Sequence, residues 1–214
     1  MQAPAAGRSP SRPDRLPLRM SRARRKLSFV VLAVSAALLL GACGESHSRV
    51  STGTYAGESG ANAPYLDVGP LVYEVQLSRL LNPYDTEDSA YLHDLPPSVS
   101  RLLPGQEWFG VFLQVYNRSP HPHLAASSVT ISDTQGTAYL PVLPGPANEF
   151  AYRGGIVPAN GRLPVLDSVA ANGATQGALL LYKINLVSLD NRPLTVTIVD
   201  PANARRAASA ELDV

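Results

Sequence analysis

The chain has 214 residues, of which 18 are basic and 17 acidic. Residues 1–42 carry eight of the basic residues and one acidic residue, so residues 43–214 keep ten basic and sixteen acidic residues, a net charge of −6. Such an acidic segment lacks the basic footprint that nucleic acid requires, and it does not favour adhesion to anionic lipid head groups. Cys43 is the only cysteine, and both methionines lie in residues 1–42. Disulfides and metal sites built on sulfur are therefore excluded from residues 44–214.

A basic segment followed by an apolar run opens the chain. Eight basic residues stand in residues 1–26, and the sixteen residues from Leu27 to Ala42 carry no charge. This order is typical of a secretory signal peptide, and the run is shorter than the about 20 residues of a membrane-spanning helix. We therefore expect the chain to begin with a cleaved signal peptide and the rest of the chain to lie outside the cytoplasm.

The end of the apolar run, Leu40-Gly41-Ala42-Cys43, resembles the lipobox of bacterial lipoproteins. The resemblance implies cleavage between Ala42 and Cys43 and attachment of a diacylglyceryl group to the thiol of Cys43. One acyl chain anchors a protein only marginally, whereas two hold it stably. We thus expect a protein anchored in the cell membrane through lipid on Cys43, on the extracytoplasmic face. The alternative is a buried or idle cysteine in an uncleaved anchor.

Residues 44–64 are small and polar, with many glycines and serines, which predicts a flexible tether. The expected organisation is a signal peptide (1–42), a lipidated cysteine and tether (43–64) and one folded domain (65–214).

Short runs with alternating apolar residues begin after Gly69. In the first run one face is formed by Leu71, Tyr73, Val75 and Leu77. A clearer run spans Glu107 to Asn117 and is expected to be a central strand, whose buried face holds Phe109, Val111, Leu113 and Val115. Gln114 points to the opposite face, where its removal would cost little if that face is exposed.

Later runs complete the pattern. Polar residues Asp133 to Gly136 between two β-rich runs predict a hairpin. Residues 177–188 form a longer apolar run, which is consistent with a central strand, and residues 193–200 alternate again. Between the first two runs, residues 82–105 form a long acidic excursion, for which we expect a short helical turn near Pro97 to Leu103.

About seven or eight short strands separated by turn residues predict an all-β domain. An immunoglobulin-like antiparallel β-sandwich is favoured over a barrel because strand lengths and connections vary widely. The segments "PGQEWFGVFLQVYNRS", "ISDTQGTAYLP" and "NGRLP" before "QGALLLYKI", between Pro104 and Val199, resemble the Ig-like extracellular domains of uncharacterised bacterial lipoproteins. That resemblance implies adhesion, binding or protection, and it supplies no catalytic residue.

Two groups of residues are weak candidates for a site. His121 and His123 stand two apart and could ligate a metal, although the neighbouring prolines favour a solvated loop. The acidic residues of segment 85–94, from Asp85 to Asp94, could hold Ca²⁺, but they lack the spacing of an EF-hand loop. We assign no catalytic residue, metal or cofactor.

The leading hypothesis is a non-catalytic lipoprotein that displays an Ig-like binding or interaction domain to an unidentified protein or envelope partner. The alternative is an extracytoplasmic metal-binding protein or enzyme that uses His121, His123 and the acidic segment 85–94. A structural envelope protein without a small ligand is a third hypothesis.

Overall fold

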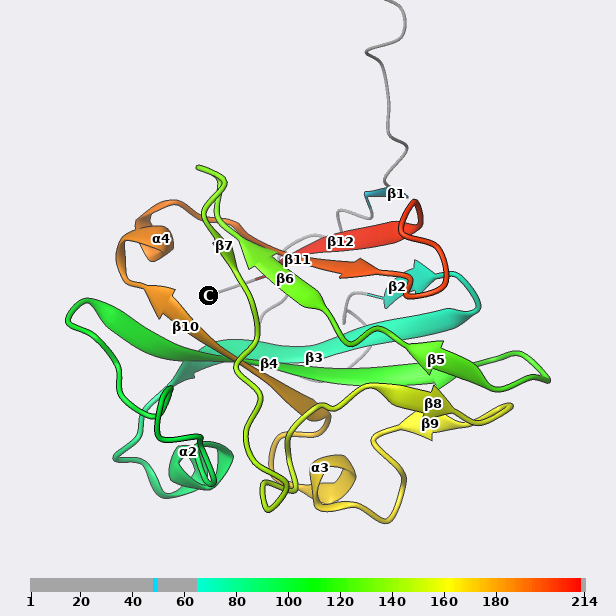
Figure 1. Cartoon of the computed structure of the whole chain (residues 1–214), viewed down its shortest axis with the longest axis horizontal. Coiled ribbons are helices and arrows are strands. Elements are labelled where there is room, and N and C mark those ends of the chain that lie inside the picture. The colour runs from blue at the N-terminus through cyan, green and yellow to red at the C-terminus, as the bar shows by residue number, and fades with distance from the viewer. Residues whose placement is uncertain (1–47, 50–64, 213–214) are drawn as a thin grey trace, which may run out of the picture. The chain divides into compact units, whose positions relative to one another are not determined.

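Two sheets and a short ribbon hold most of the regular structure (Figure 1). The computed structural model describes residues 48–49 and 65–212. The expected signal peptide, Cys43 and most of the expected tether lie outside the described residues. Ser48–Arg49, inside the segment expected to be tether, forms strand β1.

Sheet B is built around β4 (Gln106–Asn117), which pairs with strands on both sides. The strand order is β10-β4-β3-β2, and a short strand, β9, pairs with the end of β4. These partners are β2 (Tyr65–Val68), β3 (Leu71–Leu81), β9 (Arg162–Leu163) and β10 (Ala178–Asn185). All of these pairings are antiparallel.

Sheet A has the order β1-β12-β11-β6-β7 and is antiparallel apart from the pairing of β1 with β12. Its other strands are β6 (Val129–Ser132), β7 (Ala138–Tyr139), β11 (Leu194–Val199) and β12 (Ala207–Leu212). The expected hairpin at Asp133–Gly136 is confirmed, because β6 and β7 pair across this turn. Asp133 Oδ1 fixes the turn by accepting hydrogen bonds from the backbone N–H of Gln135 (3.0 Å) and Thr137 (2.8 Å).

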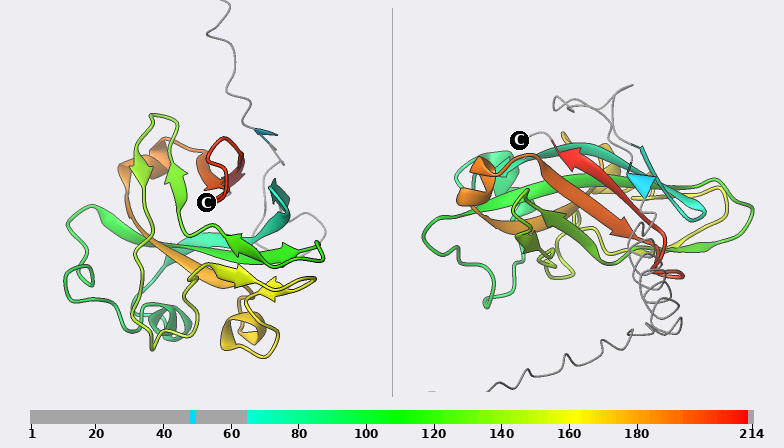
Figure 2. Two further views of the ribbon diagram at one scale, coloured as in Figure 1. Left: turned by 45° about the vertical axis from the view of Figure 1, so that its right-hand side comes forward. Right: turned by 90° about the horizontal axis from the view of Figure 1, so that it is seen from above.

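The main core lies between the two sheets, whose strands cross obliquely in the view from above (Figure 2). The expected buried face of β4 is confirmed, since four side chains on it have no exposed surface: Phe109, Val111, Leu113 and Val115. Sheet A contributes Leu194, Val196 and Ile198, which are also fully buried. The two sheets therefore form a β-sandwich, which confirms the expected all-β fold, while the Ig-like assignment remains a prediction.

A second apolar cluster covers the opposite face of sheet B. It holds Trp108 and Phe112 of β4 together with Tyr91 of α2 (Thr86–Tyr91), and the Tyr91 and Phe112 ring centroids are 5.0 Å apart. Sheet B is thus covered on both faces near the start of β4. Gln114, on this second face, is also buried, so the condition for a negligible effect of its removal is not met.

A bulge in β3 changes which side chains share a face. The register of β3 against β4 shifts between Val75 and Leu77. Because side chains alternate along a strand, one extra residue moves the following side chains to the other face. Leu77 accordingly packs in the second cluster. Its expected grouping with Leu71, Tyr73 and Val75 is wrong.

The strand β10 is buried but not central in the order of sheet B. Its free edge is covered by the segment after β7, whose backbone N–H groups at Val142 and Tyr152 donate to the carbonyls of Leu181 (2.7 Å) and Leu179 (2.8 Å). An edge strand covered in this way is as continuously apolar in sequence as a central strand. This explains why the prediction of a central strand for the apolar run of residues 177–188 is incorrect.

The helices are short. Within the acidic excursion the helix is α2, which precedes the helical turn expected near Pro97 to Leu103. At the expected place the chain forms a turn that belongs to no helix, in which the Val99 N–H donates to the carbonyl of Pro96 (2.9 Å). The remaining elements are α3 (Val169–Asn172), α4 (Val187–Asp190) and the ribbon of β5 (His123–Ala125) with β8 (Gly155–Val157). Figure 1 shows α2 and α3 on the side of sheet B away from sheet A. Of the described strands, seven have four or more residues and the rest have two or three.

Candidate functional site

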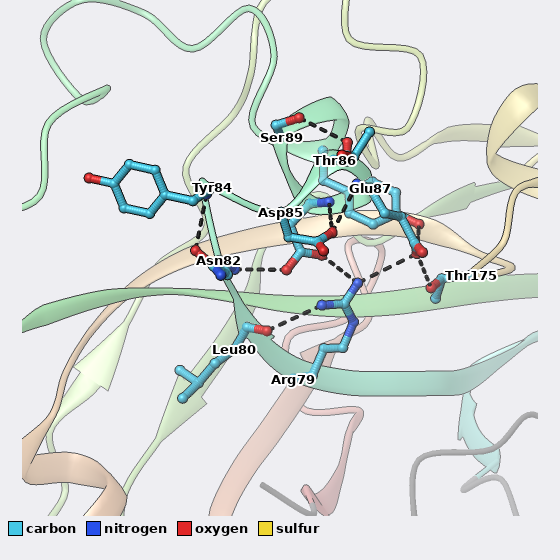
Figure 3. Close-up of polar contacts among 11 residues, drawn as sticks. Arg79, Leu80, Asn82, Tyr84, Asp85, Thr86, Glu87, Ser89 and Thr175 are labelled. Atoms are coloured by element: carbon cyan, nitrogen blue, oxygen red, sulfur yellow. Dashed lines mark hydrogen bonds and ion pairs between the residues drawn. The ribbon is translucent and has the colours of Figure 1, made fainter.

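The acidic segment 85–94 is tied to sheet B by one arginine (Figure 3). Arg79, near the end of β3, forms ion pairs with Asp88 (2.5 Å) and Glu87 (3.5 Å). Burial lowers the pKa of the Arg79 guanidinium, but the hydrogen bond and charge of Asp88 and the charge of Glu87 outweigh it and raise the pKa. The acidic excursion and β3 are therefore held together by charge.

The remaining carboxylates of this segment also have structural partners. Asp85 caps α2 by accepting from the backbone N–H of Glu87 (2.9 Å) and Asp88 (3.2 Å), as expected of an aspartate before a first helical turn. Asp88 accepts from the Asn82 N–H (2.7 Å), and Asp94 accepts from the Ala147 N–H (2.9 Å).

Glu87 is the fourth acid of the segment, and its carboxylate accepts hydrogen bonds from two hydroxyls. It accepts from Tyr91 (2.8 Å) and from Thr175 (3.2 Å). Together with the cap and the ion pairs, these contacts show that the acidic segment, a weak candidate for Ca²⁺, is used to fix the excursion on the sheet.

Of the two candidate histidines, His121 lies in the loop before β5 and His123 is the first residue of β5. His121 is exposed, and its backbone carbonyl accepts from Asn117 Nδ2 (2.7 Å). His123 is half-buried, and its Nε2 lies 2.8 Å from Ser119 Oγ. Among residues 48–49 and 65–212, no three His, Cys, Asp or Glu side chains gather closely enough to hold a metal.

One open hollow of about 380 Å³ lies between α2 and the segment before Tyr152. Its lining includes His93 and Glu149, but Asn148 in its wall is committed to structure, because its Nδ2 donates to the carbonyls of Tyr91 (2.9 Å) and His93 (2.8 Å). Its lining contains no basic side chain besides the histidine.

A second open hollow, here called the β9 hollow, has a volume of about 540 Å³, within the range of roughly 300–1,000 Å³ that is common for small-molecule sites. It lies where β4 ends and β9 pairs with it. It is lined by Tyr116, Asn117, Arg118, Pro158, Asn160, Gly161, Arg162, Val165 and Leu166. Sequence reasoning marked "NGRLP", which contains part of this wall, only as a turn before a strand.

Asn117 fixes the walls of the β9 hollow. Its buried Nδ2 donates to the carbonyls of His121 (2.7 Å), Pro158 (2.9 Å) and Val157 (3.1 Å). Its backbone N–H donates to the carbonyl of Gly161 (2.9 Å). One side chain at the end of β4 therefore joins the histidine loop, the end of β8 and the turn before β9, so the hollow is built on hydrogen-bonded backbone.

Beside this hollow, Tyr116 contacts two polar side chains of sheet B, those of Glu74 and Gln114. Its hydroxyl lies 2.7 Å from Glu74 Oε2 and 2.7 Å from Gln114 Oε1 and donates to one of them. Burial, followed by the hydrogen bond and charge of Glu74, raises the pKa of Tyr116. The hydrogen bond with Glu74 also raises the pKa of Tyr65, together with burial and the charge of Glu74. Glu74 is itself buried, and these tyrosines provide its polar contacts.

No protein-family model matches the chain, and no curated protein matches it by sequence at a significant level. Solved structures with some similarity include a "putative lipoprotein (ycdA)" from Bacillus subtilis, at 10% identity and a TM-score of 0.43, matched over 74% of this chain. The chain spans 39% of the length of that protein.

Two further solved structures are a functionally unknown protein from Listeria monocytogenes and an uncharacterised β-sandwich protein from Clostridium difficile. The first has 8% identity and a TM-score of 0.46 over 75% of this chain and 85% of its own length. The second has 8% identity and a TM-score of 0.39 over 73% of this chain and 94% of its own length. Similarities of this size identify no shared activity.

Proposed function

We propose that the protein is a non-catalytic lipoprotein, anchored by lipid on Cys43 to the extracytoplasmic face of the cell membrane, and that its β-sandwich is a binding domain. The observation that carries the anchoring is the sequence Leu40-Gly41-Ala42-Cys43 directly after an uncharged run. A diacylglyceryl group on this thiol supplies two buried chains, which is enough for stable attachment.

None of the helices in residues 48–49 and 65–212 is long and apolar enough to cross a membrane. A separate observation on the described residues supports a domain without catalytic activity. The acidic residues and histidines that an enzyme or metal carrier would use serve instead as caps, ion-pair partners and loop residues. Arg118 and Arg162, which line the β9 hollow, form no ion pair with any described residue, so we place binding there.

The anchoring is tested by replacing Cys43 with Ser in the full chain expressed in a bacterium that processes lipoproteins. We expect the variant to lose incorporation of a labelled fatty acid and either to leave the membrane fraction or to remain as an uncut precursor. A matched control is the double variant Cys43→Ser, Ser46→Cys, which keeps one thiol but places it outside the lipobox. It should behave as the single variant does. A mature-length Cys43→Ser protein that still fractionates with membranes would show that the anchor is not lipid on Cys43.

A further inference from the structure

Two arginines of the β9 hollow have no acidic partner within the described part of the chain. Residues 65–212 hold nine Lys and Arg against thirteen Asp and Glu, so carboxylates are in excess. Arg79 and Arg206 use this excess by pairing with aspartates. Arg118 and Arg162 form no ion pair with any described residue, although both line the same hollow.

Arg162 is held in place by strand pairing. It lies opposite Tyr116 in the register of β9 against β4, so the two side chains share the face of sheet B that is turned away from the main core. Its neighbour Leu163 lies opposite Val115 and packs against that core. Arg162 Nε is buried and has no hydrogen-bond partner in the described structure. A buried donor without a partner costs free energy, and a bound acceptor would recover it.

Glu74, whose carboxylate lies on this face, forms no ion pair with the two arginines. Glu74 is buried and is bonded by the Tyr116 hydroxyl, as described above. The lining of the hollow itself contains no acidic side chain. An anion that enters from solvent therefore meets two guanidinium groups, whose planar forks bind carboxylate and phosphate oxygens in pairs.

The same hollow presents apolar surface to solvent. The side chains of Val165 and Leu166 are 56% and 62% exposed, and Pro158 is exposed beside them. An inorganic anion would leave this surface uncovered, whereas an aliphatic group would cover it and gain hydrophobic stabilisation.

We propose that the β9 hollow binds a small anionic amphiphile. Its carboxylate or phosphate head lies against Arg118 and Arg162, and its aliphatic body lies against Val165 and Leu166. This proposal does not depend on the acylation of Cys43, because every residue involved lies in the domain.

The test uses the fragment Gly44–Val214. Residues Glu45–Val214 form one compact unit, and every residue of both apolar clusters lies in it. Four probes are titrated by calorimetry below their micellar concentrations: octanoate, octyl phosphate, octyl glucoside and inorganic phosphate. We expect octanoate or octyl phosphate, or both, to bind at least tenfold more tightly than the neutral glucoside and than inorganic phosphate. The comparison of octanoate with octyl phosphate decides which head group is preferred.

Three variants locate the binding. Arg118→Gln alters an exposed side chain and therefore should not disturb folding, and it should weaken the preferred probe about tenfold, a loss of about 1.4 kcal/mol. Arg162→Gln should weaken it at least as much. Arg205→Gln is the matched control, since Arg205 is an exposed arginine in the turn between β11 and β12 of the other sheet, and it should leave binding unchanged.

Several outcomes would overturn the proposal. Equal binding of octyl glucoside and octanoate would show that the arginines do not select an anion, and equal binding of inorganic and octyl phosphate would show that the apolar surface is not used. Failure of all four probes to bind, or the same loss in Arg205→Gln as in Arg118→Gln, would show that the hollow is not the site. None of these results would affect the test of Cys43.

Discussion

Replacement of Leu113 by Ala is the most direct test of the sandwich. Leu113 has no exposed surface and lies in the middle of β4, between Val75 of β3 and Ala178 of β10 in the strand register. Both neighbouring strands fix the backbone, so the cavity left by the truncation cannot collapse easily. A buried Leu→Ala change costs about 2–5 kcal/mol, and we expect the upper half of this range here. This would remove a large part of the roughly 5–15 kcal/mol by which a domain is normally stable.

The assay is urea unfolding of the fragment Gly44–Val214, followed by the fluorescence of Trp108, which is the only tryptophan and is buried in the second cluster. Leu124→Ala is the matched control, because it is the same chemical change at a side chain that is 55% exposed, and it should alter the free energy of unfolding by about 0.5 kcal/mol or less. Gln114→Ala should fall between the two, at about 1–3 kcal/mol, because it removes a buried group that is bonded to Tyr116. The reasoning is refuted if Leu113→Ala costs no more than Leu124→Ala.

Two further predictions concern buried carboxylates. Asp88→Asn keeps an acceptor for the Asn82 N–H but loses the ion pair with the partly exposed Arg79, so the free energy of unfolding should fall by about 1 kcal/mol. The control Asp167→Asn, at an exposed site, should leave the free energy of unfolding unchanged. Equal urea midpoints for the two variants would contradict a structural role of the acidic segment. The hydrogen bond from Ser188 Oγ (2.7 Å) lowers the pKa of Asp133 below its ordinary value of 3.8, while burial opposes this shift. The ionised Asp133 carboxylate therefore stabilises the folded state above pH 3.8, and this stabilisation is lost as the pH falls through the lower pKa of the folded state. Asp133→Asn should therefore make the unfolding free energy less dependent on pH on the acid side of this value, and an unchanged pH profile would count against the role given to Ser188.

The strand pattern carried most of the fold information because alternation reports directly which residues face a core. The face of β4 that holds Phe109 and Leu113 could be predicted, and so could the hairpin at Asp133, where polar turn residues separate two β-rich runs. Both signals are local, since they depend only on residues that are close in sequence.

The errors arose where a distant segment decides the environment. The position of the bulge at Gln76 depends on the pairing of β3 with β4, and the burial of Gln114 depends on the coverage of the second face of sheet B. The edge position of β10 is hidden in its sequence because the segment around Val142 and Tyr152 covers it. None of these facts is contained in a window of neighbouring residues.

The candidate site could not be predicted for the same reason. Arg118 and Arg162 are far apart in sequence and line the same hollow only because β9 pairs with the end of β4. By contrast, the acidic run from Asp85 to Asp88 is conspicuous in sequence, yet its charges are used within the fold. Local clustering of charge therefore pointed to the acidic segment, whose carboxylates have structural partners. It missed Arg118 and Arg162, which have no acidic partner among the described residues.

The outer face of sheet B explains why a site would form at this end of β4. Near Trp108 and Phe112 the face is covered by α2 and apolar side chains. Toward the end of the strand, beyond the bulge in β3, the same face carries Glu74, Gln114 and Tyr116, which must satisfy one another. β9 adds Arg162 to this polar row but no carboxylate to pair with it. In this row Glu74 is held by Tyr116, whereas Arg162 has no ion-pair partner and its Nε no hydrogen-bond partner among the described residues, so a ligand in the β9 hollow would complete its contacts.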